Sequence, residues 1–177
     1  MSKLTLATLW LDGCSGCHMS FLDMDERLLT ILEQADLVYS PLVDIKQFPE
    51  QVDISLVEGA VSNKDDLAKV LQVRAHTRTL VAFGDCAVTG NVPSMRNVVG
   101  RTSLMETVYV ENTTIQQTPP HEIVPKLLKF VRPLHEVVPV DIFVPGCPPS
   151  ADTIFYALQE LLAGRVPDLR AVTRFGA

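Results

Sequence analysis

The chain has 177 residues, a length that favours one folded domain with its own hydrophobic core. A composition of 47% hydrophobic and 20% charged residues is typical of globular proteins and excludes an intrinsically disordered chain. The net charge of −6, the scattered basic residues and an aromatic content of 6% exclude a surface built to bind nucleic acid or anionic lipid.

The first half of the chain alternates strand-like and helix-like segments. Its hydrophobic periodicity predicts strands at 4–11, 36–40 and 52–57 and helices at 19–34 and 64–76. Asn63 is a suitable N-cap for the second helix, and Asp65 and Asp66 are suited to the positive end of its dipole.

The second half of the chain is less regular. Its pattern predicts strands at 79–83 and 140–144 and helices at 125–134 and 151–163, followed by a polar tail to residue 177. Ser150 caps the last helix and Gly164 ends it. An irregular insert at about 87–120 is expected to be a functional loop or a docking surface, because compact domains rarely carry such inserts without a use. Within it, Arg96 and Asn97 could face a partner subunit or belong to an ordinary surface loop.

The alternation of strands and helices predicts an open α/β fold, in which one domain of residues 1–177 has a parallel sheet covered on both faces. Chemically reactive side chains follow four different predicted strands: Cys14 with Cys17, Glu58, Cys86 and Cys147. Because ligands of open α/β sheets bind at the carboxyl ends of the strands, we expect these four positions to converge at one edge.

The location of the protein bears on what its four cysteines do. No apolar run approaches the roughly 20 residues of a membrane span, and the N-terminus leads into a strand-like run without an export signal. We therefore expect a cytoplasmic protein, in which cysteines are metal ligands or redox thiols rather than structural disulfides.

A Cys-x-x-Cys pair such as Cys14 and Cys17 fits a zinc site, a redox disulfide or an iron–sulfur cluster. Zinc sites commonly use two such pairs, and a redox disulfide would leave Cys86 and Cys147 without a role. One iron–sulfur cluster would use all four thiolates. The spacing favours the cluster, while zinc and free buried thiols stay open as alternatives.

Four motifs resemble those of [NiFe]-hydrogenase small subunits: Cys14-Ser-Gly-Cys17, Val57-Glu-Gly59, Gly84-Asp-Cys-Ala87 and Pro145-Gly-Cys-Pro-Pro149. The similarity runs in order from about residue 10 to 163. Through residues 84–97 and 139–147 it is strongest to the small subunit of the cytoplasmic, NAD-reducing, bidirectional hydrogenases. The terminal-cluster subunit of the quinone-linked NADH dehydrogenase is a more distant relative, with adjacent cysteines where this chain has Cys-x-x-Cys.

The resemblance implies a flavodoxin-like fold and one proximal [4Fe-4S] cluster bound by Cys14, Cys17, Cys86 and Cys147. It implies that the cluster takes electrons from the nickel–iron centre of a large subunit and passes them to a ferredoxin-like subunit and an NAD-reactive diaphorase. Exported relatives have a twin-arginine leader and a C-terminal extension with further clusters. This chain shows neither, so we expect electrons to leave through a partner. Many relatives have an acidic residue where this chain has Ser15, so no proton role is carried over to that position.

Two residues are candidates to lie beside the cluster without ligating it. Glu58 is either a proton-coupled or interface carboxylate, or a turn carboxylate that accepts bonds from backbone N–H groups. His18 is expected beside the cluster or at an interface rather than as a ligand, because four cysteines are available. No catalytic residue is expected, since the chain would carry electrons as a subunit of an H2:NAD+ oxidoreductase and make no bonds itself.

Three rival hypotheses remain. The chain could be the terminal-cluster subunit of a complex like NADH–quinone oxidoreductase. It could be an FMN-binding flavodoxin-like carrier, which predicts bound flavin and dispensable cysteines; FMN is not expected but stays open. It could also be a zinc-stabilised binding module, which predicts one colourless metal ion per chain and no redox signal.

Overall fold

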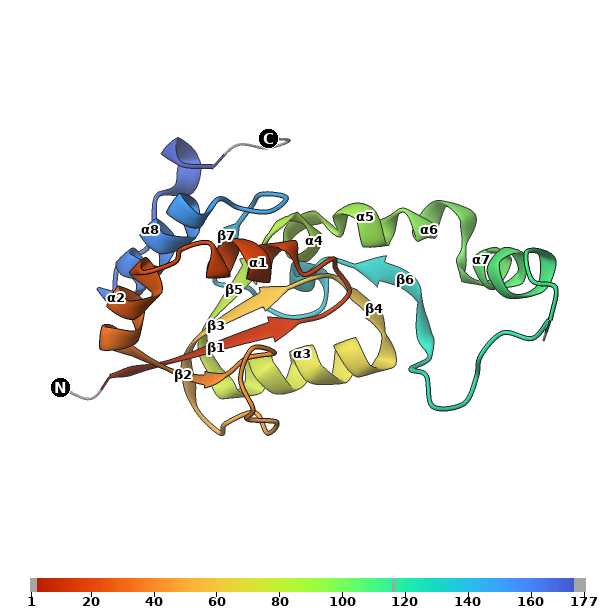
Figure 1. Ribbon diagram of the computed structural model, residues 1–177, viewed down its shortest axis with the longest axis horizontal. Coiled ribbons are helices and arrows are strands. Elements are labelled where there is room, and N and C mark those ends of the chain that lie inside the picture. Colours follow the sequence, from red (N-terminus) through yellow and green to blue (C-terminus); the bar gives the residue numbers. More distant parts are fainter. Residues whose placement is uncertain (1–2, 116, 174–177) are drawn as a thin grey trace.

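The centre of the protein is a five-stranded parallel sheet (Figure 1). The computed structural model describes residues 3–115 and 117–173. The strands of this sheet are β1 (Leu4–Trp10), β2 (Ala35–Tyr39), β3 (Val52–Glu58), β5 (Thr77–Phe83) and β7 (Ile142–Val144). They lie in the order β2-β1-β3-β5-β7, which, counted along the chain, is the 2-1-3-4-5 order of flavodoxin-like folds. The fold class is confirmed, and all five predicted strands are present with small shifts at their ends.

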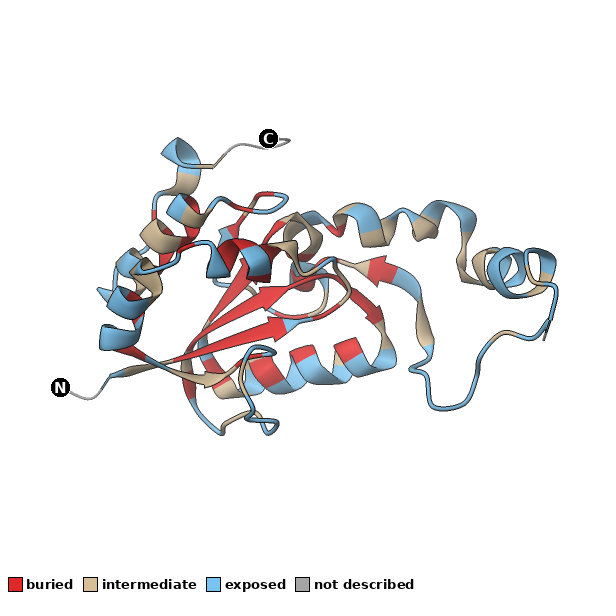
Figure 2. Cartoon of the chain, viewed as in Figure 1, coloured by how far each residue is buried: buried red, intermediate tan, exposed pale blue. Residues whose placement is uncertain are grey.

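Helices cover both faces of this sheet, because successive side chains of a buried strand point to opposite faces. Leu56 belongs to a core cluster with α1 (Gly16–Leu22), α2 (Arg27–Gln34) and α8 (Ala151–Leu162). The neighbouring Val57 belongs to a second cluster with Val70 and Val73 of α3 (Lys64–His76). Figure 2 shows the result, in which the central strands are almost entirely buried.

The helix predicted at 19–34 is two helices, because residues 23–26 form a turn between α1 and α2. Asp25 has a φ of 50°, in the left-handed region that a continuing helix cannot use. Met24 turns inward at this break and is 1% exposed. The hydrophobic periodicity continued through the turn because both helices pack on the same face of the sheet.

Two further helices follow the sequence closely. Asn63 caps α3 by accepting bonds from Asp65 N and Asp66 N, and the Asp66 side chain accepts in return from the backbone of Asn63. Ser150 caps α8 by accepting from Thr153 N. Two 3₁₀ turns complete this half, at Leu134–Glu136 and Leu169–Ala171. The tail beyond residue 173 lies outside the described residues.

The insert expected to be irregular contains short helices as far as residue 111. These are α4 (Asp85–Thr89), α5 (Asn91–Ser94), α6 (Arg96–Val99), α7 (Arg101–Glu106) and a π-helix (Thr107–Glu111). Gly90 and Gly100, both with positive φ, separate successive helices. Figure 1 shows that α5, α6 and α7 extend away from the sheet as an arm.

The helix predicted at 125–134 is wrong, because the structure forms strand β6 (Leu127–Arg132) there. This strand pairs antiparallel with β4 (Val61–Asn63), which the sequence analysis did not predict. The short apolar run Leu127–Arg132 fits either a helix or a strand by its local pattern. Pairing with a strand far away in the chain decided between them.

Candidate functional site: a group of four thiols at the sheet edge

The carboxyl ends of four neighbouring strands lie in register. Trp10 of β1 pairs with Glu58 of β3, Glu58 with Phe83 of β5, and Phe83 with Val144 of β7. The four cysteines lie in the segments that follow Trp10, Phe83 and Val144: Cys14 and Cys147 in loops, Cys17 in the first turn of α1 and Cys86 in the first turn of α4. The chain runs from β1 to β2 on one side of β1 and then crosses to β3 on its other side. The switch in strand order therefore lies between β1 and β3, and ligands of this fold bind at such a switch. The predicted convergence is therefore present.

All four cysteines are free thiols. Cys17 is buried, Cys86 is half-buried, and Cys14 and Cys147 are exposed. Burial, followed by the charges of Glu58 and of the other three cysteines, raises the pKa of Cys17. Burial, followed by the charges of Cys147 and Cys14, raises the pKa of Cys86 to about 11. The four thiols thus form one electrostatic group, which stabilises the protonated form of its buried members.

Glycines leave room for the sulfurs and for the loops that carry them. Gly84 ends β5 with a φ of 83°, and a Cβ atom there would clash with the sulfur of Cys17. Gly146 has a φ of 140°, and a Cβ atom there would lie 2.5 Å from Pro149 Cα. Both positions require the absence of a side chain. Asp85 joins the two loops, since its Oδ1 accepts from Gly146 N at 2.7 Å.

Glu58, at the end of β3, binds the first turn of α1. Its Oε1 accepts from Cys17 N at 3.3 Å and its Oε2 accepts from His18 N at 3.1 Å. These are N–H groups of the first turn of α1, which have no partner within the helix. Ser15, the N-cap residue, makes no side-chain bond to them. The Glu58 carboxylate on β3 therefore caps the N-terminus of α1, and a capping role is one of the two alternatives predicted for Glu58.

His18 continues a buried row of polar side chains away from the thiols. Its Nδ1 is hydrogen-bonded to Glu58 Oε2, and its Nε2 lies 3.0 Å from Thr8 Oγ1. The hydroxyl of Thr8 lies 2.7 Å from that of Ser40. With both ring nitrogens engaged and 4% exposure, His18 is available neither as a metal ligand nor as an interface residue. The His18 ring therefore fixes the carboxylate of Glu58, which in turn binds the first turn of α1 beside Cys17.

The donor set fits an iron–sulfur cluster better than a single metal ion. Among the described residues, no three Cys, His, Asp or Glu side chains lie close enough together to hold one ion. A zinc ion needs sulfurs at about 2.3 Å from the metal, and hence about 4 Å from one another. A cluster with one thiolate per iron holds its ligands farther apart and needs no other donor type.

Two residues of the arm have a structural role instead of facing outward. Arg96 donates to the carbonyl oxygens of Leu128 and Ser62, at 3.2 and 2.8 Å. Asn97 exchanges two hydrogen bonds with the backbone of Val131. These side chains bind backbone groups of β4 and β6, so the suggestion that they face a partner subunit is not supported.

One residue of the site, Asn91, was not predicted from the sequence. Its side-chain Nδ2 donates to Cys147 Sγ at 3.4 Å, and its φ of 32° is in the left-handed region. The available signal was the pair Gly90-Asn91, because glycine and asparagine together are typical of a turn with positive φ.

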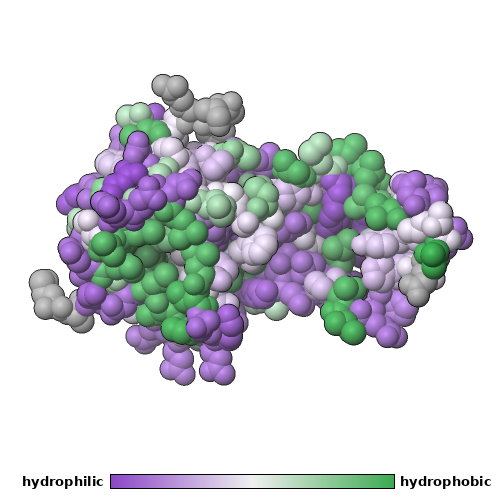
Figure 3. Space-filling view, in the orientation of Figure 1, coloured by the Kyte–Doolittle hydropathy of each residue, from purple (hydrophilic) through white to green (hydrophobic). Residues whose placement is uncertain are grey.

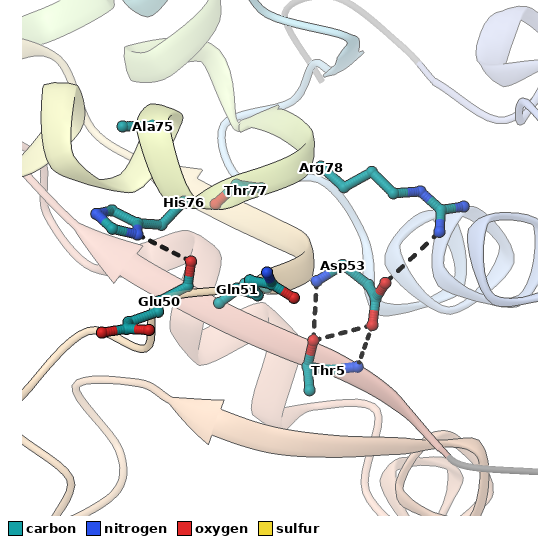
Figure 4. Close-up of a pocket in the computed structure, with 9 residues that line it drawn as sticks. Thr5, Glu50, Gln51, Asp53, Ala75, His76, Thr77 and Arg78 are labelled. Carbon is teal, nitrogen blue, oxygen red and sulfur yellow. Dashed lines mark hydrogen bonds and ion pairs between the residues drawn. The ribbon is translucent and has the colours of Figure 1, made fainter.

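A hollow of about 510 Å³ lies at the end of the sheet opposite the thiols, among the first residues of β1, β3 and β5. Figure 4 shows that its polar side chains already engage one another. Asp53 Oδ2 accepts from Thr5 N and Thr5 Oγ1, both at 2.9 Å, and Arg78 lies 3.6 Å from Asp53 Oδ1. His76 Nδ1 bonds to the carbonyl of Glu50 at 2.9 Å. We therefore assign the functional site to the thiol edge.

None of the helices that the structure describes is both long enough and apolar enough to pass through a membrane.

The model of the family described as NADH ubiquinone oxidoreductase, 20 Kd subunit, matches residues 14–161. The chain is 44% identical over 172 residues to the NAD-reducing hydrogenase HoxS subunit delta of Cupriavidus necator, with 94% of this chain and 82% of the relative covered. It is 38% identical to a subunit of the F420-non-reducing hydrogenase vhu of Methanococcus voltae, with 94% of this chain and 59% of that relative covered.

Solved structures agree with these relatives. A chain of an NAD+-reducing [NiFe]-hydrogenase in the H2-reduced state superposes with a TM-score of 0.93 at 39% identity, covering 98% of this chain and 99% of that one. A chain of the [NiFeSe]-hydrogenase of Dm. baculatum, at 17% identity and a TM-score of 0.60, shares the fold. The chain therefore belongs to the NADH ubiquinone oxidoreductase 20 Kd subunit family, and within it to the hydrogenase subunits.

Proposed function

We propose that this chain is the electron-transfer small subunit of a cytoplasmic NAD-reducing [NiFe] hydrogenase. It holds one [4Fe-4S] cluster, the proximal one, on Cys14, Cys17, Cys86 and Cys147. The single observation that carries the proposal is the group of four free thiols at the in-register carboxyl ends of β1, β5 and β7. The hydrogenase family supplies the second support.

The chain's own residues provide a site that is held in place and partly shielded from water. Glu58 and His18 fix the loop that carries Cys14 and Cys17, and the backbone of Gly84 lets the Cys17 sulfur approach β5. Asp85, the first residue of α4, connects the helix that carries Cys86 to the loop that carries Cys147. When bound, the cluster supplies one-electron transfer. Two thiols are exposed, so electrons can enter and leave through partner subunits that cover this edge.

Apolar side chains exposed near the thiols support a partner at this edge. Trp10, whose indole N–H bonds to Gly13 O, and Met19 on α1 flank the first cysteine loop, and Val92 follows Asn91. Figure 3 shows further apolar side chains gathered over α2 and β2 and along the arm. Exposed apolar side chains that gather in patches are typical of a surface that binds a partner protein. We assign the thiol edge to a nickel–iron large subunit and electron exit to a ferredoxin-like subunit and a diaphorase.

The proposal is tested first by composition. The full chain, purified anaerobically, is expected to contain about four irons and four sulfides per chain and to show a spin-half EPR signal after dithionite reduction. One zinc ion without a signal would instead establish a structural module. Flavin without iron would establish a flavodoxin-like carrier.

The partner is tested separately. The tagged chain, isolated anaerobically from cells that produce it naturally, is expected to bring down a nickel-containing subunit and H2-dependent NAD+ reduction. Quinone reduction by NADH in a complex without nickel would replace the proposal with the terminal-cluster subunit of a quinone-linked dehydrogenase.

A further inference from the structure

Asn91 has a backbone conformation that few residues adopt. It begins α5 directly after Gly90, which ends α4, and the two residues have φ values of 32° and 85°. Consecutive positive φ values reverse the chain sharply here. Asparagine tolerates this region better than most residues, yet a non-glycine residue there still carries strain. Such strain persists where the surrounding structure enforces it and is frequent at functional sites.

The reversal directs the Asn91 amide onto a cysteine. Nδ2 donates to Cys147 Sγ at 3.4 Å, although the two residues are 56 positions apart. Among the described residues, Asn91 is the one side chain that hydrogen-bonds to any of the four sulfurs. Gly90 N donates to Cys86 O and Ser94 Oγ donates to Asn91 O, so the turn is held without the amide–sulfur bond.

We infer that Asn91 raises the reduction potential of the cluster through its N–H···S bond to Cys147. The inference rests on the proposed function, because it requires a cluster on these four thiolates. Reduction adds one electron, and part of the new negative charge falls on the thiolate sulfurs. A donated N–H group stabilises that charge more strongly in the reduced than in the oxidised form. No bond forms or breaks, and the amide proton stays on nitrogen.

Two substitutions separate the donor from the backbone turn. Asn91→Gly removes the amide and relieves the strain at positive φ, so folding is not endangered. Asn91→Asp keeps the shape of the side chain but replaces the donor with a carboxylate. Asn112→Asp is the matched control, since it makes the same exchange on the exposed residue that follows the π-helix.

The measurement is a potentiometric titration followed by EPR, on the full chain purified anaerobically, with iron and sulfide counted in each sample. At a fixed ambient potential, the ratio of reduced to oxidised cluster is expected to fall about three- to tenfold in Asn91→Gly. A tenfold fall is a shift of 59 mV for one electron. The fall is expected to be larger in Asn91→Asp, and Asn112→Asp is expected to match the wild type.

Wild-type potentials in both Asn91 variants, with full iron and sulfide, would overturn the inference and leave the cluster assignment standing. Loss of iron from both variants would also overturn it, because the amide would then hold the cluster instead of setting its potential. A wild-type chain without iron would overturn the proposed function and this inference with it.

Discussion

The two ends of the central sheet use the same strands for opposite purposes. At the amino end, Asp53 of β3 accepts bonds from Thr5 and pairs with Arg78, so that polar groups satisfy one another. At the carboxyl end, Glu58 of the same strand supports a loop whose thiols have no covalent partner. Closed polar networks stabilise a fold, whereas free ligands that are held in place prepare it to bind something else.

Iron binding at the carboxyl end of the sheet is expected to depend most on the four thiols. Cys86→Ser is expected to lower the iron content to below about half of the wild type, since a cluster uses one thiolate per iron. H2-dependent NAD+ reduction by the complex should fall with it. The fold should persist, because Cys86 is half-buried and the exchange is nearly isosteric. Iron analysis and circular dichroism check both parts, and normal iron with full activity would remove Cys86 from the ligand set.

Glu58→Gln tests whether the support beneath the thiols matters as much as the thiols themselves. The amide group of glutamine would face N–H donors that now meet a carboxylate, so we expect a loss of about 2–3 kcal/mol in the free energy of unfolding. The Cys17 loop should also hold iron less well. Urea unfolding and iron analysis measure the two effects. Unchanged values in both would show that Glu58 contributes neither to stability nor to iron binding.

The metal-free chain should lose stability at alkaline pH because of the buried thiols at the carboxyl end of the sheet. Burial and the neighbouring thiols raise the pKa of Cys86 from its ordinary 9.0 to about 11, and that of Cys17 is raised as well. Between these values the unfolded chain releases thiol protons that the folded chain keeps, so stability falls as pH rises and is unaffected below about pH 8.

Urea unfolding of the reduced, chelator-treated chain at about pH 7.5 and about pH 10, on either side of the ordinary thiol pKa, measures this effect. In a Cys17→Ser, Cys86→Ser double variant the alkaline loss should shrink. An equal loss in that variant would place its origin in lysines or tyrosines instead.

Asp53→Asn is expected to have the smallest effect and sharpens the contrast within β3. It weakens bonds to Thr5 and the pair with Arg78, which is mostly exposed, and should cost about 1 kcal/mol of stability. Iron content and the EPR signal should equal those of the wild type. A cluster defect in this variant would show that the two ends are coupled through the sheet.

The sequence alone determined where strands end and where thiols follow them. Hydrophobic periodicity and the glycines after β5 and β7 are local signals, and parallel pairing then forces the strand ends to one edge. The caps of α3 and α8 were equally readable, because a cap and its N–H partners are neighbours in the chain. The identity of the cluster ligands stays a prediction that iron analysis must test.

Tertiary structure decided the rest, because the deciding partners lie far apart in the chain. β6 is a strand because β4 and the side chains of Arg96 and Asn97 take up its backbone groups. Glu58 caps α1 from 40 positions away, and Asn91 reaches Cys147 across 56. A local pattern contains no information about such distant partners, so only the folded chain shows which polar groups meet.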